Sequence, residues 1–281
     1  MKTTSFDWKS PAGLKIYAEC WAPDNSSSQA PKAVILLQHG LGEHLGRYTH
    51  VGEFFVSKNM VVLANDRAGH GRSEGKRGHI PKYEQTLDDI EKLHNEATRL
   101  FPKVPVFLYG HSMGGGIVLN YLLRRKNSSI KGIIATAPAI VPAFEPSKGA
   151  VFMGKLMRKI WGGYVQNNQL DVSKISRSAA VVEAYKSDKL VHSQLSAEMG
   201  IGLLEWGQFL LDYKGASPLP LLILHGDADG LTSFPSSEKF VKQLTGDVTF
   251  IPYKGLYHEL HNEPEQQTVL GDMYAWMQNK L

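Results

Sequence analysis

Cysteine is almost absent from the sequence, since Cys20 is the single one among 281 residues. One thiol excludes an intrachain disulfide and the paired C-x-x-C spacing of zinc and redox sites. Long apolar runs are also missing, because none approaches the roughly 20 residues that a membrane-spanning helix needs. Residues 1–15 lack the basic-then-apolar layout of a signal peptide. We therefore expect a cytoplasmic protein, either free or bound peripherally to a membrane.

A strong excess of one charge is lacking too. The formal charge is +4, from 31 Lys and Arg against 27 Asp and Glu, which is too small and too evenly spread to indicate a nucleic-acid partner. No repeat of fixed period occurs, which excludes a repeat array. A chain of this length with 42% hydrophobic residues can bury one substantial core. We expect one globular domain, with or without an insertion, and no feature predicts an oligomeric state.

Short apolar runs alternate with amphipathic stretches from residue 33 onward. Such runs, buried on both faces, belong to a parallel sheet, and the stretches between them supply crossover helices. Two earlier runs flank a turn and predict an antiparallel start, followed by a hairpin turn or surface loop at Asp24–Ser28. The early strands are expected around Ser5–Trp8 and Leu14–Trp21, and the later ones at Val34–Leu37, Val61–Ala64, Val106–Tyr109, Ile133–Ala135, Leu221–Leu224 and Thr249–Pro252. The helices are expected at Tyr83–Leu100, Met113–Arg125, Ser236–Leu244 and Pro264–Leu281.

One segment interrupts this alternation. Between Thr136 and Leu221, roughly eighty residues carry helical rather than strand signals, which is too long for a connection inside a compact fold. We interpret residues 137–217 as an inserted helical cap, and residues 1–136 with 218–281 as the α/β core.

The sequence Gly110-His111-Ser112-Met113-Gly114 fits the pattern G-x-S-x-G. A predicted strand precedes it and a predicted helix follows, which is the context of the nucleophile elbow in α/β-hydrolases. The flanking glycines give the space that so tight a turn requires. The alternative is a glycine-rich turn with an incidental serine. The context favours Ser112 as nucleophile and an α/β-hydrolase fold, with a mostly parallel central sheet, helices on both faces and the inserted cap.

A serine nucleophile needs a base and an acid, which follow it in the order Ser, acid, His in this fold. Two carboxylates, Asp227 and Asp229, follow the predicted strand Leu221–Leu224. Spacing favours Asp229, which lies further past the strand end, while Asp227 suits a turn. A turn role stays open for both.

Two histidines, His258 and His261, follow the last predicted strand. His258 comes directly after the loop and is the expected base, whereas His261 also fits a surface or helix-start position. The two are three positions apart, and the zinc motif H-E-x-x-H needs four. We therefore predict no metal and no cofactor.

Acyl transfer also needs backbone N–H donors for the developing oxyanion. One should be that of Met113, directly after the nucleophile. The other should come from the loop Gln38–His44, where Leu41 is the candidate. The alternative for this loop is a plain glycine turn.

Several motifs together resemble the monoacylglycerol lipase and lysophospholipase group, over nearly the whole chain. They are His39-Gly40-Leu41-Gly42-Glu43-His44 with Gly46-Arg47-Tyr48, Asp66-Arg67 with Gly69-His70-Gly71-Arg72-Ser73-Glu74-Gly75, Gly110 to Gly115, and Tyr257-His258-Glu259-Leu260-His261. The resemblance implies a triad of Ser112, Asp229 and His258, with Leu41 and Met113 as oxyanion donors. It also implies that a glycerol head is surrounded, directly or through water, by Glu43, Arg47 and His261.

The stretch Asp66–Gly75 could be mistaken for a phosphate-binding loop. Its glycines, at 69, 71 and 75, do not have G-x-G-x-x-G spacing, and it follows the wrong strand for a dinucleotide fold. We interpret it as a scaffold loop.

The cap contains an amphipathic helix with the basic residues Lys155, Arg158 and Lys159 opposite its apolar face. Such a helix can lie at a membrane interface or pack its apolar stripe onto the enzyme body, and the sequence does not separate the two. A second apolar stretch can either line an acyl tunnel or form cap core. The first face comprises Phe152, Met153, Leu156, Met157, Ile160 and Trp161, and the second Met199, Ile201, Leu203, Leu204, Trp206, Phe209 and Leu210.

The resemblance implies a cofactor-independent serine hydrolase that cleaves monoacylglycerols, with a small lipid ester as its partner. Alternatives with the same triad are a lysophospholipase, a broad-specificity carboxylesterase and an acyltransferase. A peptidase also fits the triad, although the apolar cap favours lipid. The non-enzyme alternative is a ligand receptor on a hydrolase scaffold.

Overall fold

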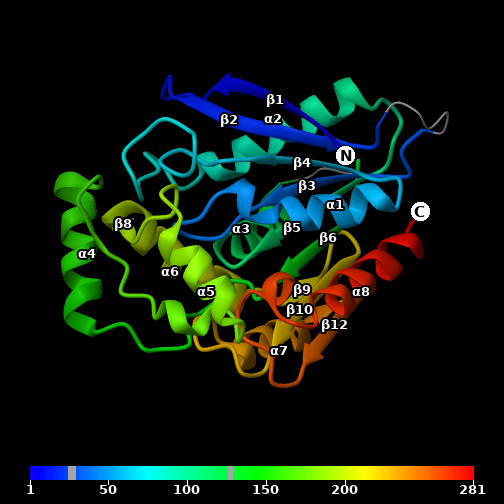
Figure 1. The fold of residues 1–281 in the computed structure, drawn as a ribbon. Coiled ribbons are helices and arrows are strands. Elements are labelled where there is room, and N and C mark those ends of the chain that lie inside the picture. Colours follow the sequence, from blue (N-terminus) through cyan, green and yellow to red (C-terminus); the bar gives the residue numbers. More distant parts are fainter. Residues whose placement is uncertain (25–29, 126–128) are drawn as a thin grey trace.

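The centre of the molecule is an eight-stranded sheet (Figure 1). The computed structural model describes residues 1–24, 30–125 and 129–281. The strand order is β1-β2-β4-β3-β5-β6-β10-β12, with β1, β2 and β4 paired antiparallel and the remaining neighbours parallel. The strands are β1 (Lys2–Lys9), β2 (Lys15–Ala22), β3 (Val34–Gln38), β4 (Val61–Asn65), β5 (Val106–His111), β6 (Ile130–Thr136), β10 (Leu221–Gly226) and β12 (Val248–Tyr253).

Helices cover both faces of the sheet. Successive side chains of a strand point to opposite faces, so Val34 and Leu36 of β3 join one apolar cluster while Ile35 and Leu37 join the other. One face is covered by α1 (Thr49–Ser57) and α8 (Gln266–Gln278). The other is covered by α2 (Gln85–Leu100), α3 (Met113–Arg124) and α7 (Phe234–Lys242). Burial on both faces explains why the parallel strands are continuous apolar runs.

The predicted α/β-hydrolase architecture is confirmed. Every predicted strand overlaps an observed strand of the sheet, and each predicted helix overlaps an observed one. The helix α1 was not predicted, because its sequence THVGEFFVS is rich in residues of low helix propensity. Packing of its buried Val51 and Phe55 against the sheet overrides that propensity. The predicted loop at Asp24–Ser28 lies, apart from Asp24, outside the described residues.

The segment for which the sequence predicts a cap runs from β6 to β10. Its helices gather beside one end of the sheet, with α4 at the margin of the molecule (Figure 1). They are α4 (Lys148–Trp161), α5 (Ala179–Ser187) and α6 (Ala197–Asp212). Short strands pair outside the main sheet, β7 (Val165–Asn167) with β8 (Gln194–Ser196) and β9 (Gly215–Ala216) with β11 (Leu244–Thr245). The 3₁₀ turns are η1 (Leu45–Tyr48), η2 (Val172–Lys174) and η3 (Leu260–Asn262).

Candidate active site

Ser112 stands on a strained turn between β5 and α3. Its φ of 55° and ψ of −119° lie outside the regions that L-residues usually adopt. The conformation is held by neighbouring backbone, since the N–H of Ser112 donates to the carbonyl of Thr136 at 3.0 Å. A Cβ at Gly110 would lie 2.3 Å from the oxygen of Gly114, and one at Gly114 would lie 2.1 Å from the oxygen of Gln38. Only glycine therefore fits at positions 110 and 114, two residues before and two residues after this serine.

The structure brings together the three side chains predicted to form a triad. His258 Nε2 lies 2.9 Å from Ser112 Oγ, and His258 Nδ1 lies 2.7 Å from Asp229 Oδ2. Ser112 follows β5, Asp229 follows β10 and His258 follows β12, so all three lie beyond the carboxyl ends of parallel strands. This row has the geometry in which an imidazole takes a proton from a hydroxyl while a carboxylate orients it.

The two candidate carboxylates have different surroundings. The side chain of Asp229 is fully buried, and its Oδ1 accepts from the N–H groups of Leu231 at 2.7 Å and Thr232 at 3.0 Å. Asp227 is exposed, and its Oδ1 accepts from the N–H of Gly255 at 2.6 Å. Asp229 therefore faces the base, whereas Asp227 joins two loops.

In the buried pair His258 and Asp229, each residue shifts the pKa of the other. Burial acts to lower the pKa of His258, but the Asp229 carboxylate outweighs burial, so the pKa of this imidazole is raised. Burial acts to raise the pKa of Asp229, but the charge of His258 and the hydrogen bond from His225 hold that pKa well below its usual range. Asp229 therefore stays ionised and stabilises the imidazolium that forms when His258 accepts a proton.

Two backbone donors lie beside the serine. Leu41 is in the loop between β3 and η1, Met113 is the first residue of α3, and both line the same cavity as Ser112. Among the described residues, neither N–H has a hydrogen-bond acceptor. For Met113 this follows from its position, since the first turn of a helix leaves its N–H groups without helical partners. Both donors are therefore available to a ligand at Ser112.

The cavity above Ser112 has a volume of about 530 Å³, within the range of small-molecule sites. Its catalytic end is formed by Ser112, His258, Leu41 and Met113. Away from the serine it passes between α4 and α6, where its wall is largely apolar. The residues from these two helices include Ala150, Val151, Gly154, Ile201, Leu203 and Leu204.

The second apolar stretch of the predicted cap divides between the two predicted roles. Ile201, Leu203 and Leu204 line the cavity, whereas other members, Met199 and Leu210, are fully buried in the core. A helix presents different faces to its two sides, so both interpretations hold for different residues.

The residues implied to surround a glycerol head lie behind the cavity wall. Glu43 accepts from the N–H of Gly40 at 2.5 Å and from the guanidinium of Arg47, which also forms two hydrogen bonds to Glu259. His261 is fully buried and stacked on another ring. None of the three implied residues is among those that line the cavity. Their position behind the wall differs from the direct contact with glycerol that the resemblance implies. Their polar groups are bonded within the protein or covered by rings. Contact with a glycerol head through water stays a prediction.

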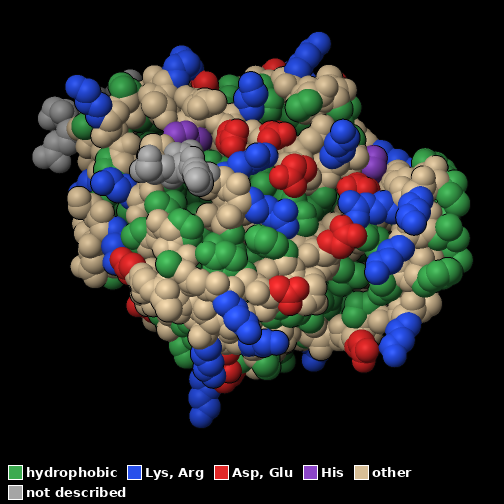
Figure 2. Space-filling view, turned by 180° about the vertical axis from the view of Figure 1, so that it is seen from behind, with side chains coloured by type: hydrophobic (Ala, Val, Ile, Leu, Met, Phe, Trp, Pro, Cys, Tyr) green, Lys and Arg blue, Asp and Glu red, His purple; other side chains and the backbone are tan. Residues whose placement is uncertain are grey.

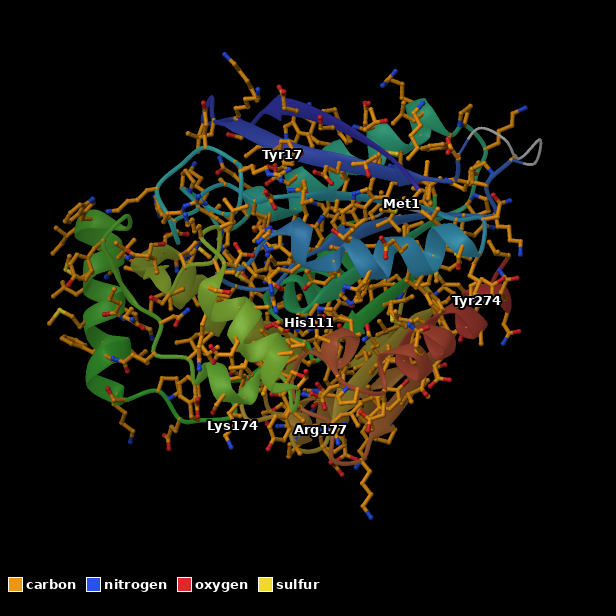
Figure 3. The ribbon with its side chains drawn as sticks, in the orientation of Figure 1. Met1, Tyr17, His111, Lys174, Arg177 and Tyr274 are labelled. Carbon is orange, nitrogen blue, oxygen red and sulfur yellow. The ribbon has the colours of Figure 1, made fainter. Side chains whose placement is uncertain are left out.

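A group of aromatic rings supports the base from behind. Figure 3 shows His111, the residue before Ser112, in the interior between the helices α5 and α6 on one side and α8 on the other. The ring of His111 lies 4.7 Å from that of His258 and 4.7 Å from that of His261, and Tyr48 stacks on His261 at 4.6 Å. His261 thus packs beneath the triad rather than at the surface position that the sequence left open.

Sequence reasoning missed several polar residues of this site. His225 Nε2 lies 3.0 Å from Asp229 Oδ2, and the hydroxyl of Thr232 donates to the same oxygen at 2.8 Å. The only available signal was their position, since His225 is near the end of β10 and Thr232 lies in the loop that follows. The run Gln166–Gln169 lines the otherwise largely apolar cavity. Its four consecutive carboxamides stand out in the sequence, but nothing there indicates which way they face.

The described ranges 1–24, 30–125 and 129–281 contain neither a helix able to cross a membrane nor a cluster of side chains able to hold a metal ion. No helix there is long and apolar enough to cross a membrane. No group of three or more His, Cys, Asp or Glu side chains in those ranges is placed to hold a metal ion.

Comparisons with known proteins agree with this geometry. Residues 29–265 match the family described as serine aminopeptidase, S33. The sequence is 37% identical over 271 residues to a monoacylglycerol lipase of Mycolicibacterium smegmatis, covering 96% of this chain and 95% of that protein. It is 37% identical over 253 residues to an uncharacterized abhydrolase domain-containing protein of Dictyostelium discoideum, covering 89% of this chain but only 27% of that protein.

A solved structure has a fold similar to that of this chain. The crystal structure of a monoacylglycerol lipase from Paleococcus ferrophilus superimposes with a TM-score of 0.84 at 27% sequence identity, and the alignment covers 100% of both chains. The similarity therefore extends through the segment between β6 and β10 as well as the sheet.

Proposed function

The chain belongs to the serine aminopeptidase (S33) family of α/β-hydrolases, and we propose that it is a serine ester hydrolase that cleaves monoacylglycerols to fatty acid and glycerol. The observation that carries this proposal is the hydrogen-bonded row of Ser112, His258 and Asp229, opening into an apolar cavity. Such a row generates an alkoxide-like nucleophile, and such a cavity holds an acyl chain.

The proposed reaction has two halves. Ser112 Oγ attacks the ester carbonyl carbon as His258 Nε2 takes the hydroxyl proton, and the N–H groups of Leu41 and Met113 bind the oxyanion. The C–O bond to glycerol then breaks, and His258 protonates the departing glycerol oxygen. In the second half His258 takes a proton from water, the hydroxide attacks the acyl carbon, and Ser112 regains its proton as the fatty acid leaves.

A lipid ester fits the cavity better than a peptide, although the family description names a peptidase. A peptide substrate needs hydrogen-bond partners along its backbone, whereas the walls contributed by α4 and α6 are mainly aliphatic. The monoacylglycerol lipase of M. smegmatis, aligned over 96% of this chain, supports the same choice. The cavity also accommodates the acyl chain of a lysophospholipid, so a lysophospholipase is the second candidate.

The segment 137–217 functions as a cap in this proposal. It supplies α4 and α6, whose facing sides enclose the cavity. Removing water from the cavity strengthens the hydrogen bonds that form at Ser112 during the reaction.

The same segment supplies a surface for peripheral membrane contact. Phe152 and Ile160 of α4 are 69% and 72% exposed, and Met153, Leu156 and Trp161 are also exposed. This face does not pack onto the enzyme body, the alternative that the sequence left open. Figure 2 shows hydrophobic side chains with Lys and Arg at the edge of the molecule formed by α4. An exposed apolar face on a helix that also carries Lys155 and Lys159 suits the interface of an anionic membrane, where the substrate is dissolved.

Replacing the nucleophile tests the proposed reaction. Ser112→Ala is expected to lower kcat for a long-chain monoacylglycerol by about 10⁴-fold or more and to abolish labelling by a fluorophosphonate. Ser57→Ala removes an exposed hydroxyl at the end of α1, away from the cavity lining, and is the matched control, with kcat expected near wild type. Retained turnover in folded Ser112→Ala would refute the assignment.

A further inference from the structure

Arg67 is a buried cation directly beneath the loop that carries Leu41. It follows β4 and is fully buried. Its Nη2 donates to the carbonyl oxygen of His39 and, at 2.8 Å, to that of Gly40. Within the described part of the chain Glu43 and Asp89 act on it only through longer-range charge, without a hydrogen bond. A buried guanidinium without an anionic partner is costly, which indicates that its contacts to this loop serve a purpose other than charge neutralisation.

The carbonyl of Gly40 belongs to the same peptide unit as the N–H of Leu41. In a planar trans peptide the C=O and N–H bonds point in opposite directions. Because Arg67 holds the oxygen of this unit from the core side, the hydrogen is directed away from the core. Leu41 lines the cavity, and a Cβ at Gly40 would lie only 3.3 Å from Ser112 Cβ. The hydrogen bond to Arg67 thus fixes the direction of a donor beside the nucleophile.

The charge of Arg67 adds to this effect. A cation bonded to the oxygen of a peptide polarises the unit and strengthens its N–H as a donor. Burial lowers the pKa of Arg67 to about 10, so the side chain remains protonated at neutral pH. Its Nε and Nη1 have no partner among the described residues. Its Nη2 also lies 2.8 Å from His39 Nδ1, so the polar contacts of the guanidinium are to His39 and Gly40.

Other contacts hold different parts of the loop. Glu43 accepts from the N–H of Gly40 at 2.5 Å, and the N–H of His192 donates to the carbonyl of Gly42 at 2.8 Å. The Nδ1 of His39 lies 2.8 Å from the oxygen of Gly40 and is the other group in contact with that oxygen. Arg67 differs from these in bringing a positive charge to the carbonyl side of the loop and in bonding two successive carbonyls.

We propose that Arg67 is a positioning residue for the oxyanion hole, which holds and polarises the Gly40–Leu41 peptide so that its N–H binds the tetrahedral intermediate. This inference rests on the proposed function. It gives the loop after β4, interpreted from the sequence as scaffold alone, a role in the transition state. The benefit arises only when negative charge develops on the substrate oxygen.

The test compares Arg67→Met and Arg67→Lys, with a soluble short-chain ester as substrate and a trifluoromethyl ketone as reversible inhibitor. The ketone adds Ser112 Oγ at its carbonyl carbon, His258 takes the proton, and the resulting oxyanion occupies the same hole. Arg67→Met should lower kcat about tenfold or more and weaken the inhibitor by a similar factor, with KM changed less than about threefold. Arg67→Lys keeps the charge and should recover part of both losses.

Arg125→Met is the matched control. It removes the same side chain from an ion pair with Asp88, without contact to the loop. Its kcat and inhibitor constant should stay near wild type, and thermal unfolding compares the stability of the variants. A purely structural role for Arg67 would lower the melting temperature of Arg67→Met without a parallel loss of kcat and inhibitor affinity.

Wild-type kcat and inhibitor affinity in Arg67→Met would overturn the inference, and so would wild-type values in Arg67→Lys if the Met variant does not fold. A fall in kcat without weaker inhibition would also overturn it. The proposed function fails separately: turnover in Ser112→Ala would refute the nucleophile, whereas inactive Ser112→Ala with unchanged Arg67 variants would refute only the role of Arg67.

Discussion

At the scale of single residues, both oxygens of the Asp229 carboxylate accept hydrogen bonds from several neighbouring groups. Its Oδ1 accepts from two backbone N–H groups, while its Oδ2 contacts His258, His225 and the hydroxyl of Thr232. Backbone donors on one oxygen fix the carboxylate plane, so the other oxygen points at the base. The position of His258 therefore depends on a small network rather than on one contact.

The neighbouring carboxylates Asp227 and Asp229 form a matched pair of test sites. Asp229→Asn should lower kcat by about 10⁴-fold, because an amide does not stabilise the imidazolium or fix the tautomer of His258. Asp227→Asn alters one exposed hydrogen bond, to Gly255, and should cost about 1 kcal/mol of stability with little change in kcat. Steady-state kinetics on both variants check this, and the reverse ranking would contradict the assignment of the acid.

The raised pKa of His258 predicts the acid limb of the pH profile. The base must be neutral to accept the serine proton, so kcat/KM rises with pH through the pKa of His258 in the free enzyme. Since Asp229 holds this pKa above its ordinary value of about 6.5, the midpoint should lie above that value. A profile of kcat/KM from acidic to alkaline pH measures it, and a midpoint below about 6.5 would be inconsistent with the buried pair.

Some residues of the site could be predicted from the sequence, and others could not. Ser112, Asp229 and His258 follow strand ends in a known order, so their convergence could be predicted from topology. The positions of Arg67 and Thr232 could not, because their contacts depend on how separate loops pack. Glu43 and Arg47 belong to motifs visible in the sequence, but only the structure reveals that they bond to each other and to Glu259.

At the scale of elements, α4 differs from the other helices of the fold. None of its residues is fully buried, and its inward side lines the cavity through Ala150, Val151 and Gly154. Arg158 anchors it to α6 by ion pairs with Glu198 and Glu205. The helix is therefore held by its polar side and by the cavity wall, while its apolar side faces solvent.

Charged substitutions on this face test the proposed membrane contact. The double variant Phe152→Glu and Ile160→Glu should weaken binding to phosphatidylcholine vesicles containing phosphatidylserine by about tenfold or more, because two apolar anchors are lost. Turnover of a soluble short-chain ester should be unchanged. Leu100→Glu introduces a charge at an exposed apolar site on α2 and is the control. Equal vesicle binding by the double variant and wild type would exclude α4 as the contact.

The elements differ in how far their sequences determine them. The parallel strands are predictable because burial on both faces leaves continuous apolar runs. The pair β7 and β8 was not predicted, since each strand has three residues and gives no periodic signal. The apolar face of α4 was predictable as a face, but its exposure was not, because amphipathicity alone does not identify what covers a helix.

At the scale of the whole molecule, the fold places a polar catalytic edge and an apolar cavity on two sides of Ser112. The core supplies a rigid edge with the triad and the oxyanion loop, and the segment between β6 and β10 supplies the apolar walls. Residues 146 positions apart, Ser112 and His258, meet because parallel strands bring their carboxyl ends to one edge of the sheet. The shape and volume of the cavity arise only from this assembly, so the sequence predicts the type of chemistry better than the size of the substrate.

Titrating Ser112 while following product release tests the central claim most directly. Samples of the protein are treated with increasing amounts of a fluorophosphonate, the labelled fraction of Ser112 is measured by mass spectrometry, and glycerol release from a long-chain monoacylglycerol is recorded. We predict that wild-type protein turns over many times and that activity falls linearly, reaching zero when Ser112 is fully labelled. Glycerol release that persists at full labelling, or an untreated protein that releases none, would contradict the account.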